Sequence, residues 1–441
     1  MQTDSTEQYP VPSPVKKMAY RFLSAFLVVL CTLSYAAPAY AESVYTYPGN
    51  PLAPYTPSLI PKVDNSCDPY VPTPKPFASS PRYRTAPYKE RPTTIKPKYV
   101  RGKNDTFKTS LYLPLRFPKV GGAYNSQSIV MVGSYIYVLY SKGTTTNKGF
   151  LVRYNQKLIK KYGLTKGLNP VKLRAAYAGQ LAPAAKITKN NKQIKSAKKR
   201  LKAKKTTKAQ RKRLNKRLKK LKKQRKLLHK KKLLQKRIRK IAKVGPTITI
   251  GHGQSLAYNP VKKELWMWRD LHNPDGSWAN PEKSCLQRIS MKTFKVNARI
   301  YFRMKAGATQ TPINGMHTLA FDKEGNGYFW RGSKDSNTIY RAQIATKSIK
   351  VEVVQGFTRK PGGNGQSLGY NAKNNRLYFV SDGAIMTVPV DKLGSLTLND
   401  LTSTTYKTAR EFEGIAFDSQ GYGHLLLNMG PEIMRTTTPS R

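Results

Sequence analysis

One pattern of polar and apolar positions recurs along the chain. It consists of a polar residue, a small residue, a short apolar segment, a turn rich in Asn, Asp or Gly, and a second aromatic or aliphatic segment. It appears at residues 125–140, 253–268, 316–330, 365–380 and 412–427. Short alternating segments joined by such turns are typical of β-hairpins. The pattern therefore predicts five similar hairpins.

Further strands are predicted after these hairpins. A third apolar segment follows at 150–154, 285–289, 338–342, 384–388 and 432–436, and a fourth is visible at 298–302 and 349–354. Repeats of about 40 to 50 residues with four strands are the signature of β-propeller blades. We therefore predict an all-β fold, a five-bladed β-propeller over residues 111–441. An irregular β-sandwich is the alternative, but it does not explain the recurring polar and small pair.

A basic insertion interrupts the repeats. Residues 186–243 contain 30 Lys and Arg and no acidic residue, and their leucines and isoleucines keep helical spacing. This pattern predicts a helix, or a helical hairpin that breaks near Thr206 and Thr207. Like charges one turn apart oppose an isolated helix. We expect the insertion to be loosely ordered in free solution and more helical on a polyanion or membrane surface.

The N-terminal residues resemble an export signal. Lys16, Lys17 and Arg21 precede an apolar run at 22–36, and small residues lead up to Glu42. This run is shorter than the roughly 20 residues that a membrane-spanning helix needs. We interpret residues 1–41 as a cleavable signal peptide, with Met18 as an alternative start, and expect a secreted protein.

Residues 42–110 form a segment rich in Pro and Tyr. This composition favours extended chain over a packed core. A flexible linker is the interpretation that we favour, and a segment that wraps the following domain is the alternative. Cys67 lies in this segment and Cys285 in the second repeat. In an oxidising compartment the two could form a disulfide, with two separate thiols as the alternative.

The charge of the chain points to polyanionic partners. The formal net charge is +58, and no acidic residue occurs between Asp105 and Glu264. Export disfavours nucleic acid and favours teichoic acid, acidic polysaccharide or an anionic membrane surface, with charge as a means of retention at the cell wall. The residues predicted to bind the polyanion are Arg211, Lys212, Arg213, Lys216, Arg217, Lys219, Lys220, Lys222, Lys223 and Arg225.

The first strand of each blade lines the central channel of a propeller. The aligned polar residues, predicted to form a ligand-binding ring at one mouth of that channel, are Gln127, Gln254, His317, Gln366 and Glu413. The alternative is a structural ring that bonds neighbouring blades and ordered water. Only Glu413 is anionic, whereas calcium needs several carboxylate oxygens. We therefore expect no metal ion and no cofactor.

An enzymatic role is the alternative to binding. His252 with His317 or Glu413 could act as an acid/base pair in a secreted, glycan-directed hydrolase. Asp270, Asp275, Asp335 and Asp382 lie near repeat edges, but no pair of carboxylates stands out. Neither a Gly-x-Ser-x-Gly elbow nor a His-Glu-x-x-His motif is present.

Tryptophans cluster in the second and third repeats. Trp266 and Trp268 alternate on a predicted strand, which favours packing between blades. Trp278 lies in the polar loop at 273–280 and is the better candidate for stacking on a sugar ring.

Two repeat motifs resemble a known family. Residues 251–258 (GHGQSLAY) and 411–417 (EFEGIAF) resemble repeat motifs of the helveticin J family, secreted large bacteriocins of lactic acid bacteria. The likeness covers roughly residues 110–441 without the basic insertion. It implies a propeller-like extracellular protein that acts on, or attaches to, bacterial envelopes. The preferred hypothesis is thus a secreted cationic binding protein, bacteriocin-like or adhesive, and a purely structural surface protein is a further possibility.

Overall fold

The computed structural model describes residues 43–46, 61–72, 94–102, 105–114, 117, 124–143, 146–164, 176–177, 183–279, 284–306, 311–312, 318–332, 337–346, 348–408, 410–428 and 430–440. The predicted signal peptide at 1–41 and His317 lie outside these residues. The chain divides into two units, Met1–Ser43 and Val44–Arg441. Strand β1 (Ser43–Thr46) spans the boundary, and the second unit is described below.

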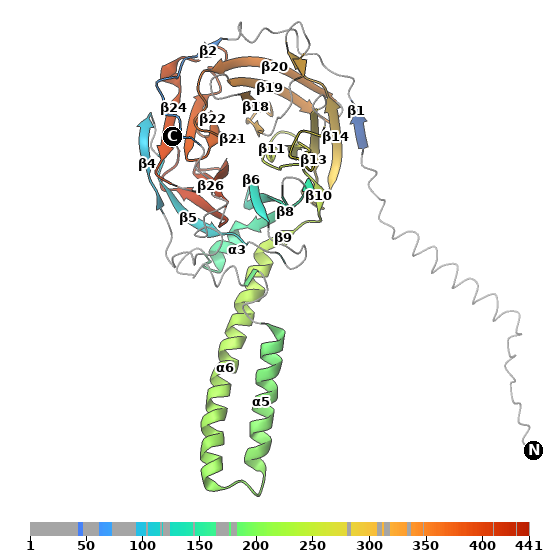
Figure 1. Ribbon diagram of the computed structural model, residues 1–441, viewed down its shortest axis with the longest axis vertical. Coiled ribbons are helices and arrows are strands. Elements are labelled where there is room, and N and C mark those ends of the chain that lie inside the picture. The colour runs from blue at the N-terminus through green and yellow to red at the C-terminus, as the bar shows by residue number, and fades with distance from the viewer. Residues whose placement is uncertain are drawn as a thin grey trace, which may run out of the picture. The chain divides into compact units, whose positions relative to one another are not determined.

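The second unit consists mainly of antiparallel sheets, arranged around a common centre as in a β-propeller (Figure 1). In the described part of the chain, five larger sheets each run as a meander from an inner to an outer strand. Their strands are β6 (Asn125–Val132), β7 (Tyr135–Ser141), β8 (Lys148–Asn155), β9 (Ala242–Val244) and β10 (Ile248–Thr249); β11 (Ala257–Asn259), β12 (Glu264–Trp268), β13 (Ser284–Ile289) and β14 (Val296–Phe302); β17 (Ala320–Phe321), β18 (Gly327–Gly332), β19 (Asn337–Ala345) and β20 (Ser348–Phe357); β21 (Gly365–Asn371), β22 (Arg376–Ser381), β23 (Ala384–Pro389) and β24 (Thr402–Tyr406); and β25 (Phe412–Phe417), β26 (Gly423–Leu427) and β27 (Glu432–Thr436). A small two-stranded sheet joins β15 (Lys305–Ala306) and β16 (Thr311–Pro312). The predicted all-β class is confirmed.

Described parts of the Pro-rich segment pair with the outer edges of three sheets. Strand β2 (Lys62–Val63) runs parallel to β20, β4 (Pro97–Arg101) pairs with β24, and β5 (Phe107–Tyr112) pairs with β27, with β3 (Thr94–Ile95) outside it. These strands cover edges that would otherwise present unpaired backbone groups. In its described parts the segment therefore wraps the sheets and is not a flexible linker.

Aromatic side chains fill the spaces between the sheets. Trp266 and Trp268 are fully buried, as their alternation on β12 predicted. The ring of Trp268 lies 5.7 Å from that of Phe302 and 5.1 Å from that of Phe329 in the next sheet. Trp330 makes a similar contact with Phe379 at 5.6 Å. These edge-to-face and tilted contacts hold neighbouring sheets in a fixed relation.

The basic insertion contains two antiparallel helices, α5 (Ala184–Lys202) and α6 (Lys208–Ile241). Thr207 caps α6 with a reciprocal capping box to Gln210, which explains why the chain turns at this point. A narrow seam, in which Ile194, Ala197 and Leu221 are buried, joins the helices. At the base, Ile238 and Ile241 of α6 enter the core of the β6–β8 sheet, next to the short helix α3 (Gln156–Lys161).

The predicted disulfide between Cys67 and Cys285 is not present. Cys67 is exposed just after β2, which pairs with β20, whereas Cys285 is buried in β13 of a different sheet. The two thiols are free, so the disulfide predicted from redox compartment alone was wrong. None of the helices in the described residues is long and apolar enough to span a membrane.

Candidate ligand-binding cleft

Most of the predicted polar ring lies at β-bulges. The ladder between the first and second strands shifts at Gln127, at Gln366 and at Glu413, so each is an extra residue without a partner across the ladder. Bulges re-aim a side chain away from the pleat and often lie next to functional sites. The small residue that follows Gln127 contributes to packing, because the hydroxyl of Ser128 donates to the carbonyl of Gly253, in the loop before β11, at 2.8 Å.

Three ring residues contact one another. The Nε2 of Gln254 donates to the Oε1 of Gln366 and lies 3.4 Å from the Oε2 of Glu413. Gln366 in turn donates to Asp382 Oδ1 at 3.1 Å. Gln127 is also buried, and its Oε1 has no hydrogen-bond partner among the described residues. The structure thus brings Gln254, Gln366 and Glu413 together across three sheets.

Carboxyl groups at this end of the channel are difficult to ionise. Burial, together with the charges of Glu411 and Asp382, raises the pKa of Glu413 well above its usual range. Burial and the charge of Asp382 raise the pKa of Glu411 to about 7. The pKa of Asp382 is also raised by burial. Glu413 is therefore protonated at pH 7, so the ring carries little negative charge, whereas Glu411 is about half protonated at that pH.

A cleft of about 490 Å³ opens beside this network. Its lining includes the predicted residues His252, Gln254 and Gln366, but neither Gln127 nor Glu413. Glu413 is only 1% exposed, whereas Glu411, two residues earlier, lines the cleft. Of these two glutamates, Glu411 and not the predicted Glu413 therefore lines the cleft.

One wall of the cleft is formed by His252, Asp270, His272 and Trp278. The ring of His272 lies 4.4 Å from that of Trp278 and 6.2 Å from that of His252. Asn147, from the loop before β8, fixes this wall: its side chain accepts from the His272 N–H at 2.8 Å and donates to the His272 carbonyl at 2.6 Å. Trp278, which the sequence predicts as a ligand contact because of its polar loop, lines the cleft.

Asp270 is the buried acid of this wall. Its Oδ1 accepts the backbone N–H of His252 at 3.0 Å. Burial nevertheless raises the pKa of Asp270 to about 8, and the same cause lowers the pKa of His272. At neutral pH the wall therefore presents a protonated carboxyl group and a neutral imidazole.

Other lining residues supply cations and an indole. They are Trp330, Arg331 and Lys360, together with the glycine-rich turn before β21. Gly365 is required there because a Cβ would lie only 2.7 Å from the Trp330 ring. Sequence reasoning missed Arg331, Lys360, His272 and Glu411, since they lie in loops or at strand ends without a periodic pattern.

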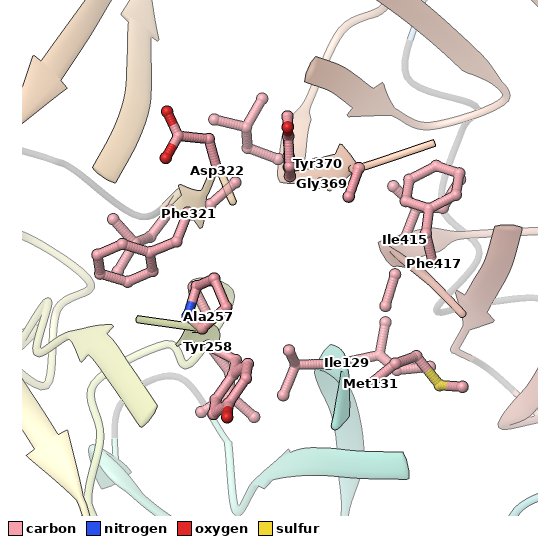
Figure 2. A pocket seen from close by; sticks show the side chains of 18 of the residues that line it. Ile129, Met131, Ala257, Tyr258, Phe321, Asp322, Gly369, Tyr370, Ile415 and Phe417 are labelled. Atoms are coloured by element: carbon pink, nitrogen blue, oxygen red, sulfur yellow. The ribbon is translucent and has the colours of Figure 1, made fainter. Parts of the chain in front are cut away.

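The opposite end of the channel is apolar. Residues two and four positions after the ring residues line a separate pocket of about 210 Å³, among them Ile129, Met131, Tyr258, Tyr370 and Phe417 (Figure 2). The inner strands therefore change from polar to apolar along the channel. Within the described residues, no group of three or more His, Cys, Asp or Glu side chains could hold a metal ion.

The helical hairpin α5–α6 forms a second candidate surface. Its two helices contain 8 and 19 basic residues and no acidic one. All ten residues predicted to bind a polyanion are exposed on α6. Because the seam buries so few side chains, positive charge covers nearly every face of the hairpin.

Comparison with known proteins assigns no family to the chain. No protein-family model and no curated protein matches it. The resemblance to the helveticin J family therefore stays a prediction.

Several solved structures show limited similarity to this chain, and three of them illustrate its extent. A protein provisionally described as a gluconolactonase has 15% identity and a TM-score of 0.28, with 41% of this chain and 56% of that chain covered. A Bacteroides thetaiotaomicron protein of unknown function has 11% identity and a TM-score of 0.31, with 77% and 70% covered. A glucose dehydrogenase has 8% identity and a TM-score of 0.31, with 79% and 96% covered. At these values the similarities assign no activity to this chain.

Proposed function

We propose that this protein is a secreted, five-bladed propeller that binds anionic polymers of the cell envelope through the α5–α6 hairpin. The observation that carries the proposal is the hairpin itself, whose cations are exposed except for the half-buried Lys231 and have no acidic neighbour on either helix. Ordinary surface helices mix both charge signs. A surface of one sign attracts polyanions and raises their local concentration.

The shape of the hairpin supports a flexible polymer as the ligand. A helix that binds a membrane surface needs a broad apolar face opposite its charged face. On α6 the exposed large apolar side chains among the described residues are Leu227 and Leu233. Their positions, six residues apart, put them about 120° apart around the helix. Teichoic acid or acidic polysaccharide, which can wrap the hairpin, therefore fits better than a membrane.

The proposal also includes the number of propeller blades and the export of the protein. Five sheets whose inner strands line one channel support five blades. Export through residues 1–41 would bring the hairpin to the envelope, where a bacteriocin-like or adhesive role follows the resemblance to the helveticin J family. Nucleic acid remains the disfavoured partner.

Attachment to whole bacterial cells tests this proposal. We expect binding that weakens steeply with salt and falls on cells stripped of teichoic acid, because screening acts strongly on exposed charges. Replacing Lys219, Lys220 and Lys223 by Gln should weaken attachment more than replacing the exposed propeller residues Lys295, Lys350 and Lys373. Equal effects of the two triple variants, or attachment indifferent to molar salt, would refute it.

The cleft favours a second candidate function, a glycan-directed hydrolase. Glu411, with a pKa near 7, and the neutral Asp270 could act as proton donor or acceptor. The roles expected for His317 and Glu413 pass to residues that line the cleft. Wall and polysaccharide degradation by the purified protein should be lost in Glu411→Gln. No degradation by the parent protein excludes this function.

A further inference from the structure

Four residues that line the cleft each carry a buried polar atom that lacks a partner in the described part of the chain. Asp270 Oδ2, His272 Nδ1, Trp330 Nε1 and Glu411 Oε2 have no protein hydrogen-bond partner within the described residues. The Asp270 and Trp330 residues are only 7% and 4% exposed. Buried polar atoms are almost always paired in folded proteins, so several unpaired atoms in one cleft point to a polar ligand.

The chemistry of these four atoms matches hydroxyl groups. An indole N–H only donates, a neutral imidazole nitrogen accepts or donates according to its tautomer, and a protonated carboxyl group does both. A hydroxyl group also donates and accepts, so a ligand with several hydroxyls can satisfy all four atoms. An ion such as sulfate would offer acceptors alone.

Two more features narrow the ligand. Trp278 and His272 present adjacent rings on one wall, a surface suited to the C–H face of a sugar ring. Arg331 and Lys360 line the same cleft and favour an anionic group. The cleft volume of about 490 Å³ lies within the range of roughly 300–1,000 Å³ of small-molecule sites.

We propose that the cleft binds one acidic unit of a glycan or polyol chain, with its hydroxyls at the four unpaired atoms and its carboxylate or phosphate toward Arg331 and Lys360. The inference deepens the proposed function and rests on it for the origin of the ligand, since the hairpin would hold the polymer and the cleft would recognise its repeating unit. Recognition here is short-range and saturable, in contrast to the attraction of the hairpin.

Calorimetry with the full mature protein tests the cleft separately from the hairpin. The probes are trigalacturonate, a glycerol phosphate trimer and neutral maltotriose, each titrated at about 0.5 M salt to screen the hairpin. We expect saturable one-to-one binding of one acidic trimer and much weaker binding of maltotriose. Binding of trigalacturonate would identify the anionic group of the ligand as a carboxylate, and binding of the glycerol phosphate trimer would identify it as a phosphate.

Variants connect this binding to the cleft. Lys360→Gln and Trp278→Ala should each weaken the acidic trimer about tenfold or more, whereas the exposed Lys350→Gln should not change its affinity. The variant in which Lys219, Lys220 and Lys223 are replaced by Gln should keep trimer binding while its attachment to cells weakens. Trimer binding therefore tests the cleft inference, and cell attachment tests the proposed function, so the failure of one can be told from the failure of the other. The inference would be overturned if neither acidic trimer showed saturable binding, or if maltotriose bound as tightly as the acidic trimer. Unchanged affinity in both cleft variants would overturn it as well.

Discussion

At three of the repeats, a β-bulge accounts for the polar residue near the start of the inner strand. At Gln127, Gln366 and Glu413 the chain inserts an extra residue, which turns its side chain toward the channel. After the last of these bulges, little space is left for a large side chain, because a Cβ at Gly414 would already contact Ile129 Cγ2 and Ser367 Oγ at 3.4 Å. The polar and small pair is thus a consequence of bulge geometry, and the chemistry of the cleft comes from residues beside it.

Asp270 should make stability depend on pH. Its pKa is about 8 in the folded protein and about 3.9 in an unfolded chain. Between these values the folded state holds a proton that the unfolded state has lost, so the free energy of unfolding falls as pH rises from about 4 to 8. The slope from this one group approaches roughly 1.4 kcal/mol per pH unit.

Urea unfolding at pH 5 and pH 7.5 measures this effect. Asp270→Asn keeps an oxygen for the His252 N–H and cannot ionise, so its stability should fall less between the two pH values than that of the parent protein. Asp275→Asn is a suitable control because Asp275 is exposed and its pKa is lowered by the hydroxyl and N–H of Ser277. A pH dependence identical in the parent and Asp270→Asn proteins would contradict the prediction.

At the scale of elements, the hairpin is held together by very few contacts. The seam contains Ile194, Ala197 and Leu221, and Asn190 adds a 3.4 Å bond to the Leu221 carbonyl. Repulsion among 27 cations opposes these contacts, so their balance depends on ionic strength. Added salt or polyanion should therefore stabilise the two helices.

Two leucines of α6 test this balance. Leu221 is buried in the seam, whereas Leu227, nearly two turns later, is 53% exposed. Leu221→Ala should speed amide hydrogen exchange across both helices by tenfold or more, as expected for about 2 kcal/mol or more of lost packing. Leu227→Ala should change exchange little, and added polyphosphate should slow exchange in both variants. Equal effects of the two substitutions would show that the seam does not hold the hairpin.

Elements differ in how well the sequence predicts them. The inner strands and α6 follow from local periodicity, because alternation and helical spacing are imposed by the face that each element buries. Strands β2 and β4 do not, because this proline-rich chain forms strands by pairing with β20 and β24, respectively, about 300 residues away. Cleft residues such as His272 and Lys360 lie in loops, where position depends on tertiary contacts such as that of Asn147.

At the scale of the whole molecule, one sheet joins the beginning and the end of the described repeats. Strand β5 precedes every repeat and pairs with β27, the last strand. Glu432 of β27 is fully buried, forms an ion pair with Arg410 and accepts the hydroxyl of Thr109 in β5 at 2.8 Å. Arg101 of the wrapping segment is similarly tied to the chain near the 3-10 turn η4 (Leu398–Asp400), because its Nη1 donates to the carbonyls of Leu398 and Leu401 at 2.6 and 2.7 Å. A bidentate contact with Asp68 holds the Arg101 side chain in place.

Breaking the buried ion pair between Arg410 and Glu432 should therefore destabilise all five sheets. Arg410→Met leaves the Glu432 carboxylate without its cation in a dry site, which costs about 3–5 kcal/mol. The exposed pair of Arg341 and Glu352 provides the matched control, because Arg341→Met removes the same group from a pair worth less than about 1 kcal/mol. Urea unfolding should show one cooperative transition shifted far more by the first variant. A local loss confined to β5 and β27 in hydrogen exchange, with the remaining sheets unaffected, would instead mean that the other sheets hold together without this closure.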